Sequence, residues 1–195
     1  MATIAEKNFN KFLNKCAIKN LSSGSYGLTL TASVPNIDDS PYYFLRFPQM
    51  FDNAKILKIT EVVIKVCIIY DGPPQKSQSK ERQLLPVTKD MFLDEAIIQD
   101  DIFRKSIDRY DPICAMILYY NDKISKKDLE ILYSKYSDPT EKSNSKLPQL
   151  INSNYTRFGV IVMEKGVDYN ILARSPNPIN MMSALARLIE LYSYG

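Results

Sequence analysis

A run of β-branched residues near the middle of the chain, residues 59–70, limits the possible folds most strongly. Such a run favours a β-strand, because branched side chains pack well on a pleated surface. Lys65 is the single cation within it. Burying an ammonium among apolar neighbours is costly unless an anionic group pairs with it. Two interpretations are open: Lys65 pairs with a buried carboxylate, or it alternates to the solvated face of an edge strand.

Four further segments are typical of strands: residues 16–21, 28–34, 112–120 and 158–163. The first two are joined by Ser22-Ser23-Gly24-Ser25-Tyr26-Gly27, and a Gly/Ser segment between two strands predicts a hairpin. Two of the six glycines of the chain lie in this segment. The predicted fold class is therefore α+β, with a twisted, mostly antiparallel five-stranded sheet.

A helix is predicted between the strands at residues 59–70 and 112–120. Thr88 is a suitable N-cap, Asp90 falls in the first turn, and residues 91–104 form the body. The spacing of four residues predicts one inward-facing stripe: Phe92, Glu95, Ile98 and Ile102. Glu95 is thus a carboxylate on an apolar face, and a buried carboxylate needs a cation as Lys65 needs an anion.

The remaining segments are less regular. Residues 1–13 are predicted as an amphipathic lead-in, 35–58 as a connection with an aromatic patch, and 71–80 as an exposed loop. Residues 126–136 favour a short helix, whereas 137–148 are expected to be solvated and mobile. A last helix is predicted from about Asn180, and its apolar stripe is still running where the sequence stops.

Composition excludes several classes of function. With 25 basic and 22 acidic residues, the net charge of +3 is too small to argue for nucleic acid or an anionic membrane as a partner. No apolar run approaches the ~18 residues of a membrane span, and the N-terminus lacks a signal peptide. The absence of histidine excludes Ser-His and Cys-His catalysis and His-ligated metals. Three cysteines in apolar contexts indicate buried, reduced thiols in an intracellular, cytoplasmic protein.

In their order along the chain, these pieces resemble the small lobe of a protein kinase. Residues 22–27 resemble the nucleotide-covering loop G-x-G-x-x-G, with Ser22 in place of the first glycine. Thr29 stands where the family has a valine after this loop. Val62-Val63-Ile64-Lys65 resembles the V-A-I-K strand. Glu95 takes the place of the helix glutamate that pairs with the lysine, and residues 160–166 resemble the fifth strand and the hinge.

The resemblance implies a small lobe over residues 1–162, with insertions at 35–58, 71–87 and 121–150. A hinge over 163–170 would follow, and 171–195 would begin the large lobe, cut before its catalytic loop. The spacing of Phe92, Glu95 and Gln99 also resembles kinase-like proteins of large DNA viruses, which would place the protein in the host cytoplasm or the virion.

The resemblance also implies a binding site for ATP. Lys65 would contact the α- and β-phosphates and be held there by Glu95. Gly24 and Gly27 would let backbone N–H groups approach the phosphates, with Ser22 and Ser25 completing the loop.

Four further residues complete the implied site. Tyr26, at the tip of the loop, would shield the reacting end from water. Met163 would guard the back of the pocket, and Glu164 and Lys165 would offer backbone groups to the adenine.

The groups that perform phosphoryl transfer in this family have no match. Neither an H-R-D nor a D-F-G equivalent occurs, so the expected Mg²⁺ has no ligands in this sequence. One expectation is the ATP-binding part of a serine/threonine kinase, which phosphorylates protein hydroxyls only if the missing segments are supplied. The alternative is a stand-alone pseudokinase-type module that binds nucleotide or a protein partner through residues 42–47 or 121–150. A third is an unrelated α+β domain with a chance Val-Val-Ile-Lys.

Overall fold

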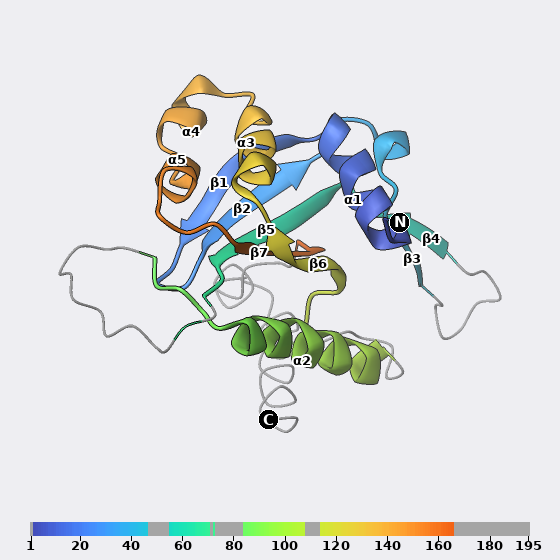
Figure 1. The fold of residues 1–195 in the computed structure, drawn as a ribbon. Coiled ribbons are helices and arrows are strands. Elements are labelled where there is room, and N and C mark those ends of the chain that lie inside the picture. The colour runs from blue at the N-terminus through green and yellow to red at the C-terminus, as the bar shows by residue number, and fades with distance from the viewer. Residues whose placement is uncertain (1, 47–54, 71, 73–83, 108–113, 166–195) are drawn as a thin grey trace, which may run out of the picture.

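The computed structural model describes residues 2–46, 55–70, 72, 84–107 and 114–165. Its centre is an antiparallel sheet in the order β1-β2-β5-β7-β6 (Figure 1). The strands are β1 (Ala17–Ser23), β2 (Leu28–Ser33), β5 (Glu61–Ile68), β6 (Ile117–Ile124) and β7 (Phe158–Glu164). The predicted α+β class and the five-stranded antiparallel sheet are confirmed.

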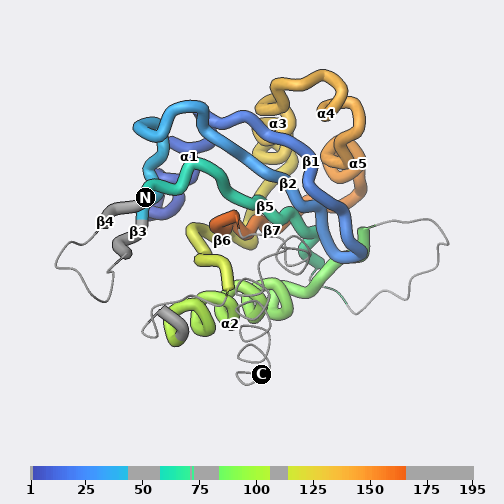
Figure 2. The backbone as a smooth tube through the Cα atoms, turned by 180° about the vertical axis from the view of Figure 1, so that it is seen from behind, coloured from blue at the N-terminus to red at the C-terminus, as the bar shows by residue number. Residues whose placement is uncertain are grey.

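Helices cover both faces of this sheet, whereas the sequence predicted one packed helix. One face carries four helices: α1 (Ile4–Lys15), α3 (Lys126–Ser134), α4 (Pro139–Ser143) and α5 (Leu147–Ile151). The opposite face carries α2 (Lys89–Ile107) alone among the described elements (Figure 2). The larger core lies on the four-helix face, and a much smaller apolar cluster lies under α2.

The predicted lead-in is a regular helix, α1. Thr3 caps it by accepting a hydrogen bond from the backbone N–H of Glu6. The helix buries Phe9, Phe12 and Leu13 in the larger core. Its apolar residues therefore belong to the fold and not to a flexible extension.

The connection at 35–58 contains the 3₁₀ turn η1 (Ile37–Asp39) and a second, two-stranded sheet of β3 (Tyr43–Arg46) and β4 (Lys55–Lys58). The buried hydroxyl of Ser40 donates to the carbonyl oxygen of Ile59 and so fastens this segment to the start of β5. The aromatic patch thus adds a small separate sheet beside the main one.

The segment after β6 differs most from its prediction. Residues 137–148 were expected to be solvated and mobile; most of residues 137–144 are exposed, but much of the segment is helical. Helices α4 and α5 form there, and Leu147 and Leu150 are buried in the larger core. β6 extends to Ile124, so residues 121–124 belong to the sheet.

Several predicted segments lie outside the described residues. These are most of the loop at 71–87, the hinge beyond Lys165 and the whole of 171–195. Within the described ranges, none of the helices has both the length and the apolar character that a membrane crossing requires.

Candidate functional site

Lys65 lies on β5, the middle strand of the sheet, and its side chain is on the α2 face. Alternation along β5 sends Val62, Ile64 and Val66 into the larger core, whereas Cys67 joins the smaller cluster under α2. Only 25% of the Lys65 side chain is exposed. The interpretation of an edge strand is therefore wrong, since β2 and β7 flank β5 on its two sides.

Glu95 of α2 is the anionic partner of Lys65. The ammonium Nζ lies 2.5 Å from Oε1 and 2.7 Å from Oε2, so both carboxylate oxygens accept a charge-assisted hydrogen bond. The pairing expected from the sequence is present. The expected burial of Glu95 is wrong, because 43% of its side chain is exposed.

The inward stripe of α2 is shifted from the predicted one. Phe92, Ala96 and Phe103 are buried, whereas Ile98 is 57% exposed. The sheet provides the reason, because the ring of Phe92 fills the space above Gly159 of β7. A Cβ at Gly159 would lie 2.5 Å from that ring. Because α2 packs on the sheet through Phe92, Glu95 lies on the side of the helix from which its carboxylate reaches Lys65.

The predicted hairpin turn closes over this part of β5. The N–H of Gly24 donates to the carbonyl of Gly27 at 3.0 Å. A Cβ at Gly27 would lie 2.9 Å from the carbonyl oxygen of Val66 and 3.5 Å from Cε of Lys65, whereas a Cβ at Gly24 would meet no atom within 4 Å. Gly27 thus allows close contact with the lysine strand, and Gly24 faces open space.

The other residues of the turn are exposed. Ser22 pairs with Thr29 just after a bulge in β1, and the side chain of Tyr26 is 53% exposed. The carbonyl of Ser25 accepts a hydrogen bond of 2.7 Å from the N–H of Leu85, just before α2. This bond ties the turn to the segment that leads into the helix of Glu95, and Figure 2 shows the two lying side by side.

The predicted hinge residues lie at the end of β7. Met163 pairs with Val63 of β5 and is partly buried against the cluster under α2. The N–H of Glu164 donates to the carbonyl of Met116 at 2.9 Å, so this group is already bonded within the sheet. Lys165 forms an ion pair of 2.7 Å with Glu61. The N–H of Glu164, which the resemblance assigned to adenine binding, is therefore already occupied by a bond to the protein.

Burial sets the titration of two groups near the site. Burial raises the pKa of the Cys67 thiol to about 11, although the nearby Lys65 ammonium acts to lower it. Burial also raises the pKa of the Glu164 carboxyl, and a hydrogen bond to the backbone of Met116 opposes the shift. Cys67 is consequently a neutral thiol at pH 7 and a poor nucleophile. All three cysteines are free, with Cys16 and Cys67 buried and Cys114 only half-buried.

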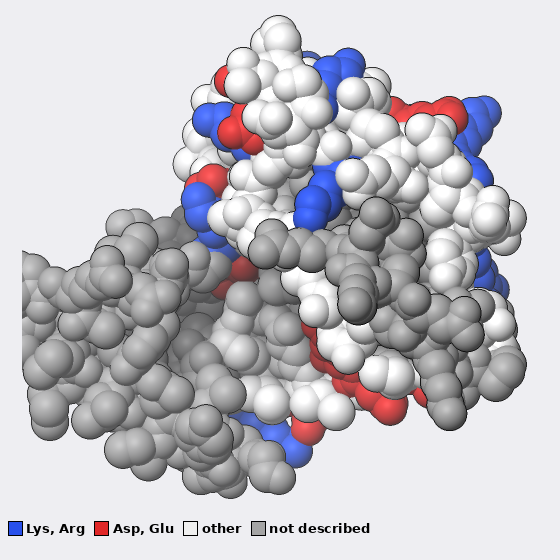
Figure 3. Space-filling model, turned by 90° about the vertical axis from the view of Figure 1, so that its left-hand side faces the viewer, with Lys and Arg blue, Asp and Glu red and all other residues white. Residues whose placement is uncertain are grey.

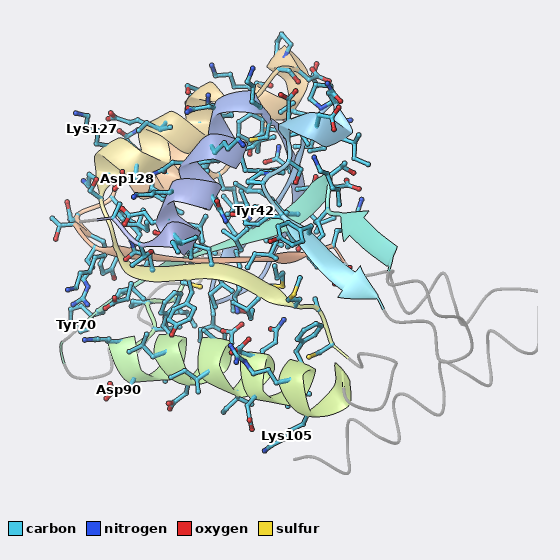
Figure 4. All side chains as sticks on the ribbon, turned by 90° about the vertical axis from the view of Figure 1, so that its right-hand side faces the viewer. Tyr42, Tyr70, Asp90, Lys105, Lys127 and Asp128 are labelled. Atoms are coloured by element: carbon cyan, nitrogen blue, oxygen red, sulfur yellow. The ribbon has the colours of Figure 1, made fainter. Side chains whose placement is uncertain are left out.

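The charges around α2 are mainly carboxylates. Figure 3 shows acidic side chains at the level of this helix, and Figure 4 shows Asp90 and Lys105 at its two ends, directed away from the sheet. Within the described ranges, His, Cys, Asp and Glu side chains form no cluster of three that could hold a metal ion. The arrangement therefore places one cation, Lys65, paired with Glu95, beneath a glycine turn.

The sequence analysis singled out Gln99 by its spacing from Phe92 and Glu95 but did not predict the contact that its side chain makes. Its side chain joins α2 to the segment before β6, and a lone Gln in a helix carries no sequence signal for such a contact.

No protein-family model matches the chain, and searches of curated proteins and of solved structures also found no match.

Proposed function

We propose that this chain is the nucleotide-binding small lobe of a protein-kinase-like domain. In this proposal Lys65, held by Glu95, contacts the α- and β-phosphates of ATP. The observation that carries this proposal is the ion pair, in which both oxygens of Glu95 lie within 2.7 Å of the Lys65 ammonium. Lys65 lies on the middle strand of the sheet, close to Gly27 of the hairpin turn.

The Lys65–Glu95 pair is suited to ligand binding because it is incompletely buried. Full burial would cost the desolvation of both charges, which only further hydrogen bonds to each group could offset. Here a quarter of Lys65 and almost half of Glu95 stay exposed. The ammonium has three donor hydrogens, so it can bond a phosphate oxygen while Glu95 holds it in place.

The position of the two glycines supports the same ligand. Gly27 keeps the hairpin close to β5, and Gly24 has open space where a side chain would stand. A phosphate could therefore approach the backbone of the turn from the side of Gly24. Exposed Tyr26 would then lie over the outer end of the ligand.

Sheet order supports the assignment of the hinge. The hairpin and β7 flank β5 on opposite sides, so the glycine turn, Lys65 and the end of β7 belong to three adjacent strands. A nucleotide could then bond the turn and Lys65 with its phosphates while its base lies toward Met163 and Lys165.

The proposal is confined to binding. Phosphoryl transfer also needs groups that hold Mg²⁺ and orient the accepting hydroxyl, and the sequence holds no H-R-D or D-F-G equivalent. Transfer to protein hydroxyls is therefore proposed only for an assembly that supplies those groups. A pseudokinase-type module that binds nucleotide or a protein partner is the second candidate.

Fluorescence titration with N-methylanthraniloyl-ATP, with and without Mg²⁺, tests the proposal. Hydrogen bonds between charged groups contribute about 1.5–3 kcal/mol, so Lys65→Ala is expected to weaken binding about ten-fold to a hundred-fold. Lys58→Ala is the matched control, because Lys58 forms an exposed ion pair with Asp38 at the smaller sheet. Unchanged affinity in a folded Lys65→Ala variant would overturn the assignment.

A further inference from the structure

The side chain of Gln99 joins α2 by a hydrogen bond to the segment just before β6, an edge strand of the sheet. Its amide Nε2 donates to the carbonyl of Ala115 at 2.9 Å and lies 3.8 Å from Sδ of Met163. The thiol of Cys114 donates in turn to the carbonyl of Gln99 at 3.4 Å. The segment just before β6 is thus bonded to one turn of α2 through both the backbone and the side chain of Gln99.

Gln99 lies one helical turn after Glu95. Residues four apart lie on the same side of a helix, so a contact that fixes one also fixes the distance of the other from the sheet. Phe92, one turn before Glu95, is fixed by its ring above Gly159. Glu95 therefore lies between an apolar contact on its N-terminal side and a polar contact on its C-terminal side.

We infer that Gln99 is a positioning residue for the Lys65–Glu95 pair: by holding α2 on Ala115 it sets the position from which Glu95 reaches the ammonium. Through its contact with Met163, Gln99 also links the helix to the strand assigned to the back of the nucleotide pocket. The consequence for nucleotide affinity rests on the proposed function, whereas the consequence for the pair does not.

The amide can be removed without emptying its space. Gln99→Met keeps the length of the side chain and loses the donor, and Gln99→Glu keeps the shape but sets a carboxylate against the Ala115 carbonyl. The matched control is Gln149→Met, the same substitution at an exposed position of α5 on the opposite face of the sheet.

The pair itself is read by ¹⁵N NMR of the Lys65 ammonium, whose protons exchange slowly with water while Glu95 holds them. Loss of one net hydrogen bond of about 1 kcal/mol corresponds to roughly five-fold, so the exchange rate should rise by about that factor in Gln99→Met. Gln99→Glu should show at least as large a rise, and Gln149→Met should show none. Gln99→Glu carries the test if Gln99→Met does not fold.

Nucleotide affinity is measured on the same samples and should fall about five-fold in the Gln99 variants. An unchanged Lys65 signal in a folded Gln99 variant would overturn the inference, even if the variant is less stable, because a purely structural role lowers stability without loosening the pair. If Lys65→Ala leaves affinity intact, the proposed function fails. A faster exchange of the Lys65 ammonium in Gln99→Met would then still support the positioning role.

Discussion

The sharpest test of the site compares alanine substitutions at Gly24 and Gly27. The same added methyl group should affect stability differently at the two positions, because only Gly27 is closely surrounded. Alanine at Gly27 would place Cβ 2.9 Å from the carbonyl oxygen of Val66 and 3.2 Å from Sγ of Cys67. The first of these atoms belongs to the backbone of the middle strand, and Cys67 is buried. Neither atom moves easily, so the hairpin has to lift away from β5.

The expected cost follows from this geometry. Inserting a methyl group into a packed site costs about 1–3 kcal/mol, and replacing glycine with alanine returns about 0.4–1 kcal/mol through the unfolded chain. Gly27→Ala should therefore lower the free energy of unfolding by about 1–2 kcal/mol. For a chain of this size that corresponds to a fall in Tm of roughly 2–8 °C.

Gly24→Ala is the control within the same turn. No atom lies within 4 Å of its added Cβ, and the residue is exposed, so the unfolding free energy should stay unchanged or rise by about 0.4–1 kcal/mol. Urea unfolding of both variants, followed by circular dichroism, measures the difference. Equal midpoints for Gly27→Ala and the unmodified protein would show that the contact at 2.9 Å is relieved at no cost, which would refute the reasoning.

Nucleotide binding then separates the roles of the two positions. Both variants should bind N-methylanthraniloyl-ATP more weakly than the unmodified protein, because Gly27→Ala moves the turn from Lys65 and Gly24→Ala fills the space assigned to the phosphates. Gly24→Ala should show this loss without any loss of stability. Unaltered binding by Gly24→Ala would place the phosphates away from the turn.

Three further substitutions test other parts of the fold. The buried hydroxyl of Tyr42 has no hydrogen-bond partner within the described residues, so Tyr42→Phe should leave the unfolding free energy unchanged or raise it by about 1 kcal/mol; a clear loss would reveal a partner. Oε2 of Glu141 accepts two hydrogen bonds of 3.0 Å from Asn20, so Glu141→Ala should cost about 1–2 kcal/mol in urea unfolding, whereas exposed Glu130→Ala should cost little. A raised pKa means that the folded state holds the Glu164 proton more tightly, so its contribution to stability is complete below the ordinary pKa and is lost as pH rises through the raised value. The stability of Glu164→Gln relative to the unmodified protein should therefore increase from pH 4 to 7, and parallel pH curves would contradict this.

The sequence was most informative where one pattern admitted one structure. The β-branched run around Lys65 predicted its strand, and the Gly/Ser segment predicted the turn of the hairpin. Helix α2 was predicted in its extent but not in its orientation. It has apolar side chains on several sides, including exposed Ile97 and Ile98, and the choice of the Phe92 face depends on the space above Gly159 of β7. A contact between segments so far apart leaves no periodic signal.

Helix α3 was expected, whereas α4 and α5 were missed for a different reason. Helices α4 and α5 have five residues each, too few for a helical period, and their surroundings are rich in polar residues. Their stability comes from tertiary contacts, namely burial of Leu147 and Leu150 and the bonds of Glu141 to β1. The Lys65–Glu95 pair, in contrast, was expected, because both residues fell on predicted apolar faces, where a charge favours a partner of opposite sign, and because the resemblance paired them.

The two faces of the sheet differ in how much apolar surface they bury, and this difference has a consequence for the site. The larger core binds β5 to α1, α3 and α5, so most of the hydrophobic stabilisation arises there. Under α2 only a small cluster around Phe92 and Ala96 is buried. Polar contacts add to the attachment, among them Lys65–Glu95, Gln99–Ala115, Cys114–Gln99 and Lys89–Asp122. Elements with few buried contacts open at lower free energy than the whole fold. Substitutions on α2 should therefore change the geometry of the ion pair while the rest of the protein stays folded. Nucleotide affinity and global stability should vary independently on this face, as they cannot in the larger core.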